Sequence, residues 1–199
     1  RLRRSAVQVP RQSRGARLAV ARHCAHQRQF FVQHADSVVI AVRYQHIAIG
    51  QHREAIGIEL LKTTKTTIRE VLVRKCRHGI HLRQRNRDFI LSDSHLLDND
   101  EYGLFFDRCN LHQIIVHGNH ISWNKKAGIR TIDGDVHNLQ ITGNDIEYNN
   151  HPGVDESPGG EPTGAEIWFE ATAGVISEVT IASNTIQATI QPGGANIRI

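Results

Sequence analysis

Hydrophobic and polar residues alternate along much of this chain in runs of three residues. The runs 129–131, 139–141 and 146–148 each begin with an apolar residue and continue with a polar one. A period of two is typical of β-strands, in which successive side chains point to opposite faces. Gly143 and Asn144 separate two of these runs, and both residue types tolerate the left-handed backbone of a tight corner. The pattern therefore predicts very short strands joined by corners.

The same pattern recurs every 25 residues, at polar as well as apolar positions. The columns at this spacing are Ser94, Asn119 and Asn144; Asn99, Asn124 and Asn149; Gly103, Gly128 and Gly153; and Leu91, Val116 and Ile141. A fixed period of this length indicates a repeat architecture. Residues 86–150 lack the apolar spacing of a helix, which argues against a leucine-rich repeat. We therefore expect an all-β, single-stranded parallel β-helix, a solenoid of about five to six coils with three strands and three corners each.

Stacking of such coils gives the Asn columns a structural role. Identical side chains of adjacent coils lie about 4.8 Å apart, which is the distance between paired strands. Asn119 above Asn144 can pass an amide hydrogen bond along the column, as stacked Asn ladders do. Asn184 continues this column after a longer interval. We interpret these residues as corner residues and not as a site.

The charge distribution divides the chain into two parts. Residues 1–35 hold eight Arg and no acidic residue, whereas the rest holds 16 basic and 20 acidic side chains. We therefore interpret residues 1–36 as a basic N-terminal tail or cap, either helical or disordered, and 37–199 as the β-helix domain. Residues 1–28 have no interleaved aromatic residues of the kind that bind nucleic acid, so this part favours a cap or tail.

The β-helix domain contains one insertion. Ile141 and Ile181 are equivalent but 40 residues apart, which is 15 more than the repeat. We expect the extra residues to form a loop near 155–163. No run of 18 apolar residues occurs, so the sequence predicts no transmembrane helix. The chain begins at Arg1 and contains no Met, which we interpret as a fragment or a processed form.

The segment 139–149 and the equivalent segment one repeat earlier, 114–124, resemble the right-handed parallel β-helix superfamily, which contains the pectate-lyase-like proteins. The resemblance covers about residues 45–199. It implies a secreted, periplasmic or cell-surface protein that acts on or binds an acidic polysaccharide. An enzyme of this kind would be a lyase, epimerase or glycoside hydrolase, although the local signatures of pectate lyases, alginate epimerases and polygalacturonases are absent. The alternative is a non-catalytic structural or carbohydrate-binding module of a larger surface protein or tail fibre.

In the polysaccharide enzymes that this chain resembles, the substrate lies along one external sheet. Here that sheet starts at the Gly column, and we predict its outward side chains to be Glu59, His81, Phe105, Arg130, Glu166 and Arg198. A lyase needs a cation for the substrate carboxylate and a base for the adjacent proton. Arg130, Lys125 and Lys126 are the candidate cations, and His81 or His151 is the candidate base. A hydrolase needs two carboxylates, for which Glu166 with Asp155 or Glu156 is the candidate pair.

The catalytic candidates are therefore His81, Arg130, Glu166, Lys125 and Lys126, and the substrate-binding candidates are Glu59, Phe105, His151, Asp155 and Glu156. The competing interpretation of this face is a solvated surface with weak cross-coil pairs.

Two columns of histidines stack at the 25-residue spacing. His95, His120 and Asp145 form one column and are candidate metal ligands, because imidazole and carboxylate suit transition metals. His112 and His137 form the other. The acidic stretch at Asp155 and Glu156 offers oxygen ligands for calcium. The apolar strand at the C-terminal end of the chain is a candidate surface for self-association.

Overall fold

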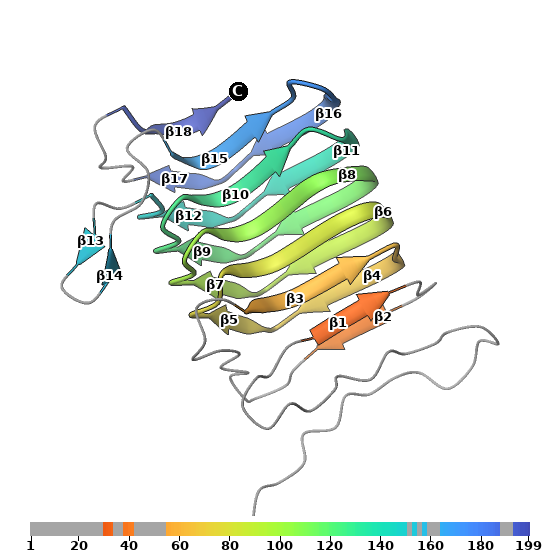
Figure 1. Cartoon of the computed structure of the whole chain (residues 1–199), viewed down its shortest axis with the longest axis horizontal. Helices are drawn as coiled ribbons and strands as arrows, with labels where there is room; N and C mark the ends of the chain where they lie inside the picture. The colour runs from red at the N-terminus through yellow and green to blue at the C-terminus, as the bar shows by residue number, and fades with distance from the viewer. Residues whose placement is uncertain are drawn as a thin grey trace, which may run out of the picture.

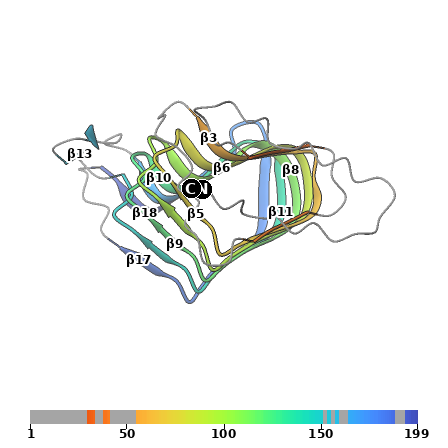
Figure 2. The same cartoon turned by 90° about the horizontal axis from the view of Figure 1, so that it is seen from below.

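The computed structural model describes residues 30–33, 38–41, 55–150, 153–154, 157–158, 164–187 and 193–199. Within these ranges every element is a β-strand, and the strands wind into a coil with three faces (Figures 1 and 2). Adjacent coils pair in parallel, so each strand lies beside its equivalent in the next coil. The predicted parallel β-helix is confirmed. Among the described residues no helix is present that is long and apolar enough to cross a membrane.

The first face contains the strands that start at the Gly column. They are β1 (Phe30–Gln33), β3 (Ile56–Leu61), β6 (His78–Ser92), β8 (Tyr102–His117), β10 (Ala127–Ile132), β15 (Ala165–Glu170) and β18 (Ala195–Arg198). Both β6 and β8 are long and continue around a corner onto the second face. There they pair with β2 (Val38–Ala41), β4 (Thr64–Arg69), β11 (Asp135–Thr142) and β16 (Val175–Ala182), directly or through a neighbour.

The third face is a separate five-stranded sheet. Its strands are β5 (Leu72–Arg74), β7 (His95–Leu97), β9 (His120–Ser122), β12 (Asp145–Glu147) and β17 (Thr185–Gln187). Each is three residues long, as the three-residue alternation of the sequence predicts. Two-residue strands β13 (Gly153–Val154) and β14 (Ser157–Pro158) pair antiparallel and stand outside the stack (Figure 1).

The strand β1 extends the coil to Phe30, ahead of the domain boundary predicted at residue 37. Residues 1–29 lie outside the described residues, so their assignment as a tail or cap stays a prediction. The strands β13 and β14 lie between β12 and β15, which is where the insertion is predicted.

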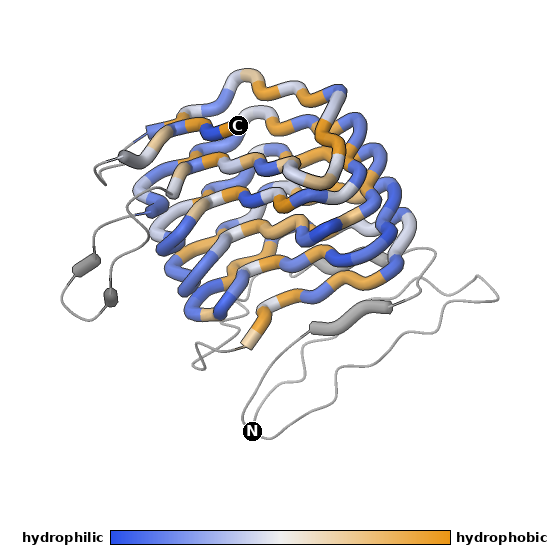
Figure 3. The backbone as a smooth tube through the Cα atoms, turned by 45° about the horizontal axis from the view of Figure 1, so that its top comes forward, coloured by the Kyte–Doolittle hydropathy of each residue, from blue (hydrophilic) through white to orange (hydrophobic). Residues whose placement is uncertain are grey.

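The core is a column of apolar side chains that point into the coil. Ile80, Leu104, Ile129 and Ile167 are in register on the first face, and all four are fully buried. Burial of each side chain of this size contributes about 1.5–3 kcal/mol. Figure 3 shows the corresponding alternation of hydrophobic and hydrophilic residues along each coil. The core stabilises the stack because every coil covers the apolar side chains of its neighbours.

The predicted Asn ladders are present and buried. In the ladder between the third and first faces, Asn99 Nδ2 donates to Asn124 Oδ1 at 2.7 Å, and Asn124 Nδ2 donates to Asn149 Oδ1 at 2.8 Å. The ladder between the second and third faces runs through Asn119 and Asn144 to Asn184 in the same way. These contacts satisfy polar groups that would otherwise be buried without partners.

Left-handed backbone occurs one residue before each Asn of the ladders. Gly118 and Gly143 take this conformation in one ladder (φ of 65° and 64°), whereas Trp123 and Tyr148 take it in the other (57° and 53°). The Asn residues themselves are not in this conformation. Their role at the corner is therefore hydrogen bonding by the side chain.

Glu166 is part of a ladder and not of the outer surface. Its Oε2 accepts hydrogen bonds from Asn149 Nδ2 at 2.6 Å and from Asn149 N at 3.2 Å. The flanking pairs Ala127–Ala165 and Ile129–Ile167 place Glu166 beside Gly128. The missing side chain of Gly128 makes room for Asn149, because an added Cβ would lie 2.7 Å from Asn149 Nδ2. The prediction that Glu166 points outward on the first face is therefore wrong.

Candidate functional site

The outward side chains of the first face form one continuous row across the coils. In order along the stack the row contains Glu59, His81, Phe105, Arg130, Trp168 and Arg198. Five of the six positions are as predicted. The exception is Trp168, which takes the position that the sequence assigned to Glu166. Ile167 and Phe169 are both buried and Trp168 between them is partly exposed, but the same alternation of residue types surrounds Glu166, so the sequence pattern alone does not choose between the two.

Aromatic and imidazole rings pack against one another at the centre of this row. His81 stacks on Phe105 with ring centroids 4.8 Å apart, and His78 stacks on Tyr102 at 5.4 Å. Tyr102 lies 4.7 Å from Phe105, and His78 lies 5.0 Å from His81. We call these four residues the ring cluster. Each is at most 8% exposed, although all four lie on the outer side of the sheet.

Burial shifts the protonation equilibria of the cluster. It lowers the pKa of His78 to about 3, with the nearby charges of His81 and Arg77 contributing in the same direction. Burial also lowers the pKa of His81, although Asp107 and Glu59 oppose this shift. Burial raises the pKa of Tyr102. At neutral pH the cluster therefore contains neutral imidazoles and a protonated phenol.

His81 is oriented by a carboxylate. Its Nε2 lies 3.4 Å from Asp107 Oδ2. The same oxygen forms an ion pair with Arg83, whose Nε lies 4.0 Å away. Because a carboxylate only accepts hydrogen bonds, the contact with His81 favours the tautomer with the proton on Nε2. The lone pair is then on Nδ1, which is buried and has no hydrogen-bond partner among the described residues.

Arg130 connects the ring cluster to the partly exposed end of the row. Its guanidinium carbon lies 3.9 Å from the ring centroid of Trp168, and that of Arg198 lies 5.2 Å from the same centroid. Arg130 is 3% exposed and forms an ion pair with Glu170 at 2.5 Å. Its Nε has no hydrogen-bond partner within the described part of the chain. Two guanidinium groups thus lie over one indole ring, beside four further rings.

The other predicted cations belong to the corner before the first face. Lys125 is buried and its Nζ lies 2.6 Å from Asp100 Oδ1, while Lys126 Nζ lies 3.8 Å from Glu101 Oε2. Both lysines therefore have acidic neighbours on the preceding coil. Glu59 at the other end of the row accepts a hydrogen bond from Arg83 at 3.2 Å. His151, Asp155 and Glu156 lie outside the described residues, so their predicted roles and the calcium site stay predictions.

The third face brings together two of the three predicted metal ligands. His120 and Asp145 are in register, and Glu147 completes a group whose ligand atoms lie within 4.8 Å of one another. His120 Nε2 and Glu147 Oε1 are 3.2 Å apart. The ring of His95 lies 5.5 Å from that of His120, outside this group of three. The predicted column does not include Glu147, although strand alternation places this residue on the same side as Asp145.

Comparison with known families agrees with this geometry. A family model described as a right handed beta helix region matches residues 30–186, which is more than half of the chain. The chain belongs to the right-handed β-helix family. No curated protein and no solved structure matches the chain. For this right-handed β-helix the predicted fold class and family resemblance are confirmed, and any activity has to be argued from the side chains of its faces.

Proposed function

We propose that this right-handed β-helix binds an acidic polysaccharide along the row of the first face. The observation that supports the proposal best is the placement of Arg130 and Arg198 over Trp168, next to the ring cluster. Guanidinium groups bind carboxylates in a bidentate manner, and aromatic rings present flat apolar surfaces to the apolar sides of sugars. An extended glycan with regularly spaced carboxylates suits a row whose positions repeat at about 4.8 Å.

The row and the ring cluster together contain the groups that a lyase reaction needs. In such a reaction the base removes the proton next to the uronate carboxylate, a carbon–carbon double bond forms, and the bond to the leaving oxygen breaks. We assign Nδ1 of His81 as the base, because its lone pair has no partner among the described residues and its imidazole is neutral near pH 7. Tyr102 keeps its proton and can deliver it to the leaving oxygen. Arg130 neutralises the charge that develops on the carboxylate once its Nη2 exchanges Glu170 for the substrate.

Burial favours a second candidate function. Phe105, Arg130 and His81 are at most 6% exposed, whereas Trp168 and Arg198 are partly exposed. A glycan that contacts only the exposed end of the row is bound without reaching His81. This is the behaviour of a non-catalytic carbohydrate-binding module.

Binding to pectate, alginate and glucuronan, with dextran as the neutral control, tests the proposal. Electrophoresis in gels that contain each polymer measures the affinity of the wild-type protein and its variants. We expect Arg130→Gln and Trp168→Ala each to weaken binding to an acidic polymer at least tenfold. Arg69→Gln is the matched control, because it removes the same charge from β4 on the second face. Equal effects of Arg69→Gln and Arg130→Gln, or equal retention by dextran, would overturn the proposal.

Release of unsaturated uronate absorbance separates the two candidate functions. A lyase gives product with at least one of the acidic polymers, and His81→Gln abolishes product while binding is retained. A binding module gives tight retention without product in the wild-type protein.

A further inference from the structure

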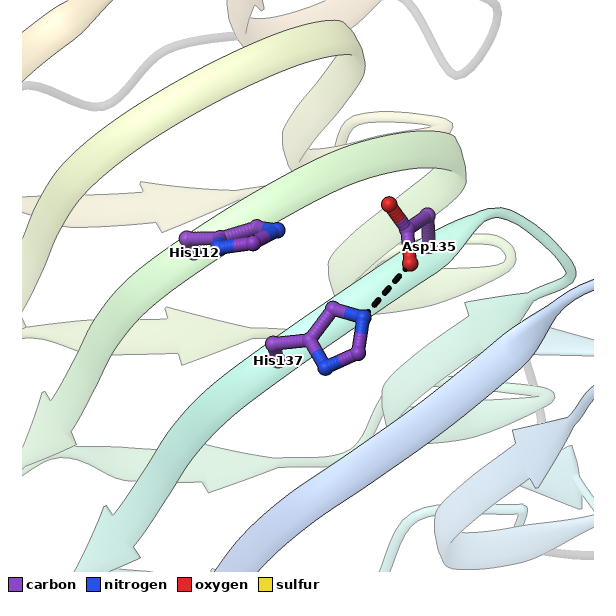
Figure 4. Close-up of side chains that lie close together, drawn as sticks. All are labelled: His112, Asp135 and His137. Carbon is purple, nitrogen blue, oxygen red and sulfur yellow. Dashed lines mark hydrogen bonds and ion pairs between the residues drawn. The ribbon is translucent and has the colours of Figure 1, made fainter.

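The second face carries a cluster of metal-ligating side chains that the proposed function does not use. His112 on β8 is in register with His137 on β11, and Asp135 lies two residues before His137 on the same side of that strand. Figure 4 shows the three side chains grouped at the corner where β8 and β11 lie side by side. All three are half-buried.

The geometry of the cluster is close to that of a coordination site. One ligand atom from each residue lies within 4.8 Å of the other two. Asp135 Oδ1 and His137 Nε2 are 2.6 Å apart, and the rings of His112 and His137 have centroids 4.8 Å apart. Bonds from zinc to imidazole and carboxylate measure about 2.0–2.2 Å. In a tetrahedral site with bonds of this length the ligand atoms lie about 3.3 Å apart. The 2.6 Å contact between Asp135 and His137 must therefore open, and His112 must move toward the pair, for all three ligand atoms to reach one ion.

Neighbouring side chains hold two of the ligands in orientation. Ser177 Oγ lies 2.6 Å from His137 Nδ1, on the side of the ring opposite Asp135. Asn110 Nδ2 donates to Asp135 Oδ2 at 2.7 Å, which leaves Oδ1 directed at His137. Metal-binding histidines usually have such a partner on the other ring nitrogen. With a metal ion on Nε2, Nδ1–H of His137 donates to Ser177 Oγ.

We propose that His112, Asp135 and His137 bind a divalent transition-metal ion of the Zn²⁺ type. Two imidazoles and one carboxylate are a known zinc ligand set, and three protein ligands leave a fourth position for water. The guanidinium of the neighbouring Arg87 donates hydrogen bonds to the main-chain and side-chain oxygens of Asn110. Arg87 therefore does not take the place of a metal ion at the Asp135 carboxylate. The site is separate from the row of the first face and from the His120 group of the third face.

Isothermal titration of the EDTA-treated full chain with Zn²⁺ tests this proposal. We expect His112→Gln and His137→Gln each to remove one binding event, and Asp135→Asn to weaken it at least tenfold. Ser177→Ala should weaken the same event by about tenfold, because the supporting hydrogen bond is lost. Titration with Co²⁺ should give a visible spectrum without thiolate charge transfer, which excludes binding by the cysteines.

Two variants serve as controls. His117→Gln changes another histidine of β8 that is outside the cluster, and Glu147→Gln changes the separate group on the third face. Both should retain the binding event assigned to His112, Asp135 and His137. Circular dichroism shows whether each variant is folded. The proposal is overturned if the wild-type chain does not bind Zn²⁺ at millimolar concentration. It is also overturned if folded His112→Gln and His137→Gln bind Zn²⁺ with unchanged stoichiometry and affinity.

Discussion

Replacement of Asn124 by Ala removes one rung from the centre of a buried ladder. Asn124 is fully buried and its side chain makes four hydrogen bonds. Oδ1 accepts from Asn99 N at 3.2 Å and from Asn99 Nδ2 at 2.7 Å. Nδ2 donates to Asn149 Oδ1 at 2.8 Å and to Leu96 O at 3.0 Å. Asn149 Oδ1 keeps a second donor, the backbone N of Asn124.

The substitution therefore leaves two buried groups, Asn99 N and Asn99 Nδ2, without their acceptor, and it removes one donor from Leu96 O, which lies in the paired strand β7. Each such group costs about 1–3 kcal/mol. Because the two Asn99 donors share one acceptor, the costs are not fully additive, and we expect a loss of about 3–5 kcal/mol. Total stabilities of domains are about 5–15 kcal/mol, so the Asn124→Ala variant loses a large fraction of its stability. Asn124→Ser should lose about half as much, because a hydroxyl at the equivalent position of the other ladder, Ser94, accepts a backbone hydrogen bond from Val71 at 3.3 Å.

Urea denaturation followed by circular dichroism measures these losses. Asn196→Ala is the control, because Asn196 is exposed and its one side-chain hydrogen bond to the described residues is a long contact of 3.4 Å with Ile186 O. Its loss should stay within about 0.5 kcal/mol. A loss of less than about 1 kcal/mol for Asn124→Ala would show that the hydrogen bonds of the ladder do not stabilise the coil.

Three further predictions follow from the core and the ring cluster. Gly128→Ala should destabilise by about 1–3 kcal/mol, because the new Cβ would lie 2.7 Å from Asn149 Nδ2 and 2.9 Å from Glu166 O. In Gly118→Ala the nearest atom to the new Cβ, Asp93 Oδ1, is 3.3 Å away, so the variant should lose only about 1 kcal/mol of stability, because of the left-handed backbone at this position. Thermal melts of the two variants measure the difference. The pKa of His78 is about 3 in the folded chain and about 6.5 when unfolded, so the unfolded chain binds the extra proton between these values. Stability should therefore fall as the pH drops below about 6.5, and His78→Gln should make that fall shallower in urea titrations at pH 7 and pH 5; identical slopes in the two proteins would contradict the assignment. Burial raises the pKa of Cys76 to about 12 and also raises that of Cys109. Iodoacetamide at pH 8 should therefore modify both thiols in urea and neither in the folded chain, as measured by peptide mass spectrometry, and rapid modification of the folded chain would show that they are accessible.

The ladders explain how the coil tolerates corners of different composition. One ladder has Gly before its central Asn residues, whereas the other has Trp123 and Tyr148 in the same left-handed conformation. These two aromatic residues stack on each other with centroids 5.0 Å apart. Left-handed backbone is unfavourable for bulky residues. The buried Asn hydrogen bonds and the ring stacking offset that cost.

The 25-residue columns could be predicted because every coil between residues 91 and 150 has the same length. Paired residues such as Ile115 and Gln140 are then separated by one repeat, and the apolar alternation tells which of them point inward. The core, the two Asn ladders and most of the row on the first face follow from these two facts. Even the column across the insertion was predictable on the second face, where Ile141 pairs with Ile181.

The first face across the insertion was not predictable in the same way. Arg130 pairs with Trp168, 38 residues later, whereas Ile141 pairs with Ile181, 40 residues later. The corner between β15 and β16 is therefore two residues longer than the corner between β10 and β11. A change in corner length leaves the alternation within each strand intact, so the pattern of hydrophobic and polar residues does not reveal it.

The amino-acid sequence was thus sufficient for the coil, because strand alternation and equal repeat lengths specify which backbones pair and which side chains are buried. The folded chain was needed to place Trp168 beside Arg130, Glu166 at the end of a ladder, and Asp135 and Glu147 beside their histidines. These neighbours depend on corner lengths and side-chain directions. Such features arise only when the coils stack, since the contacts that select them join residues from different coils.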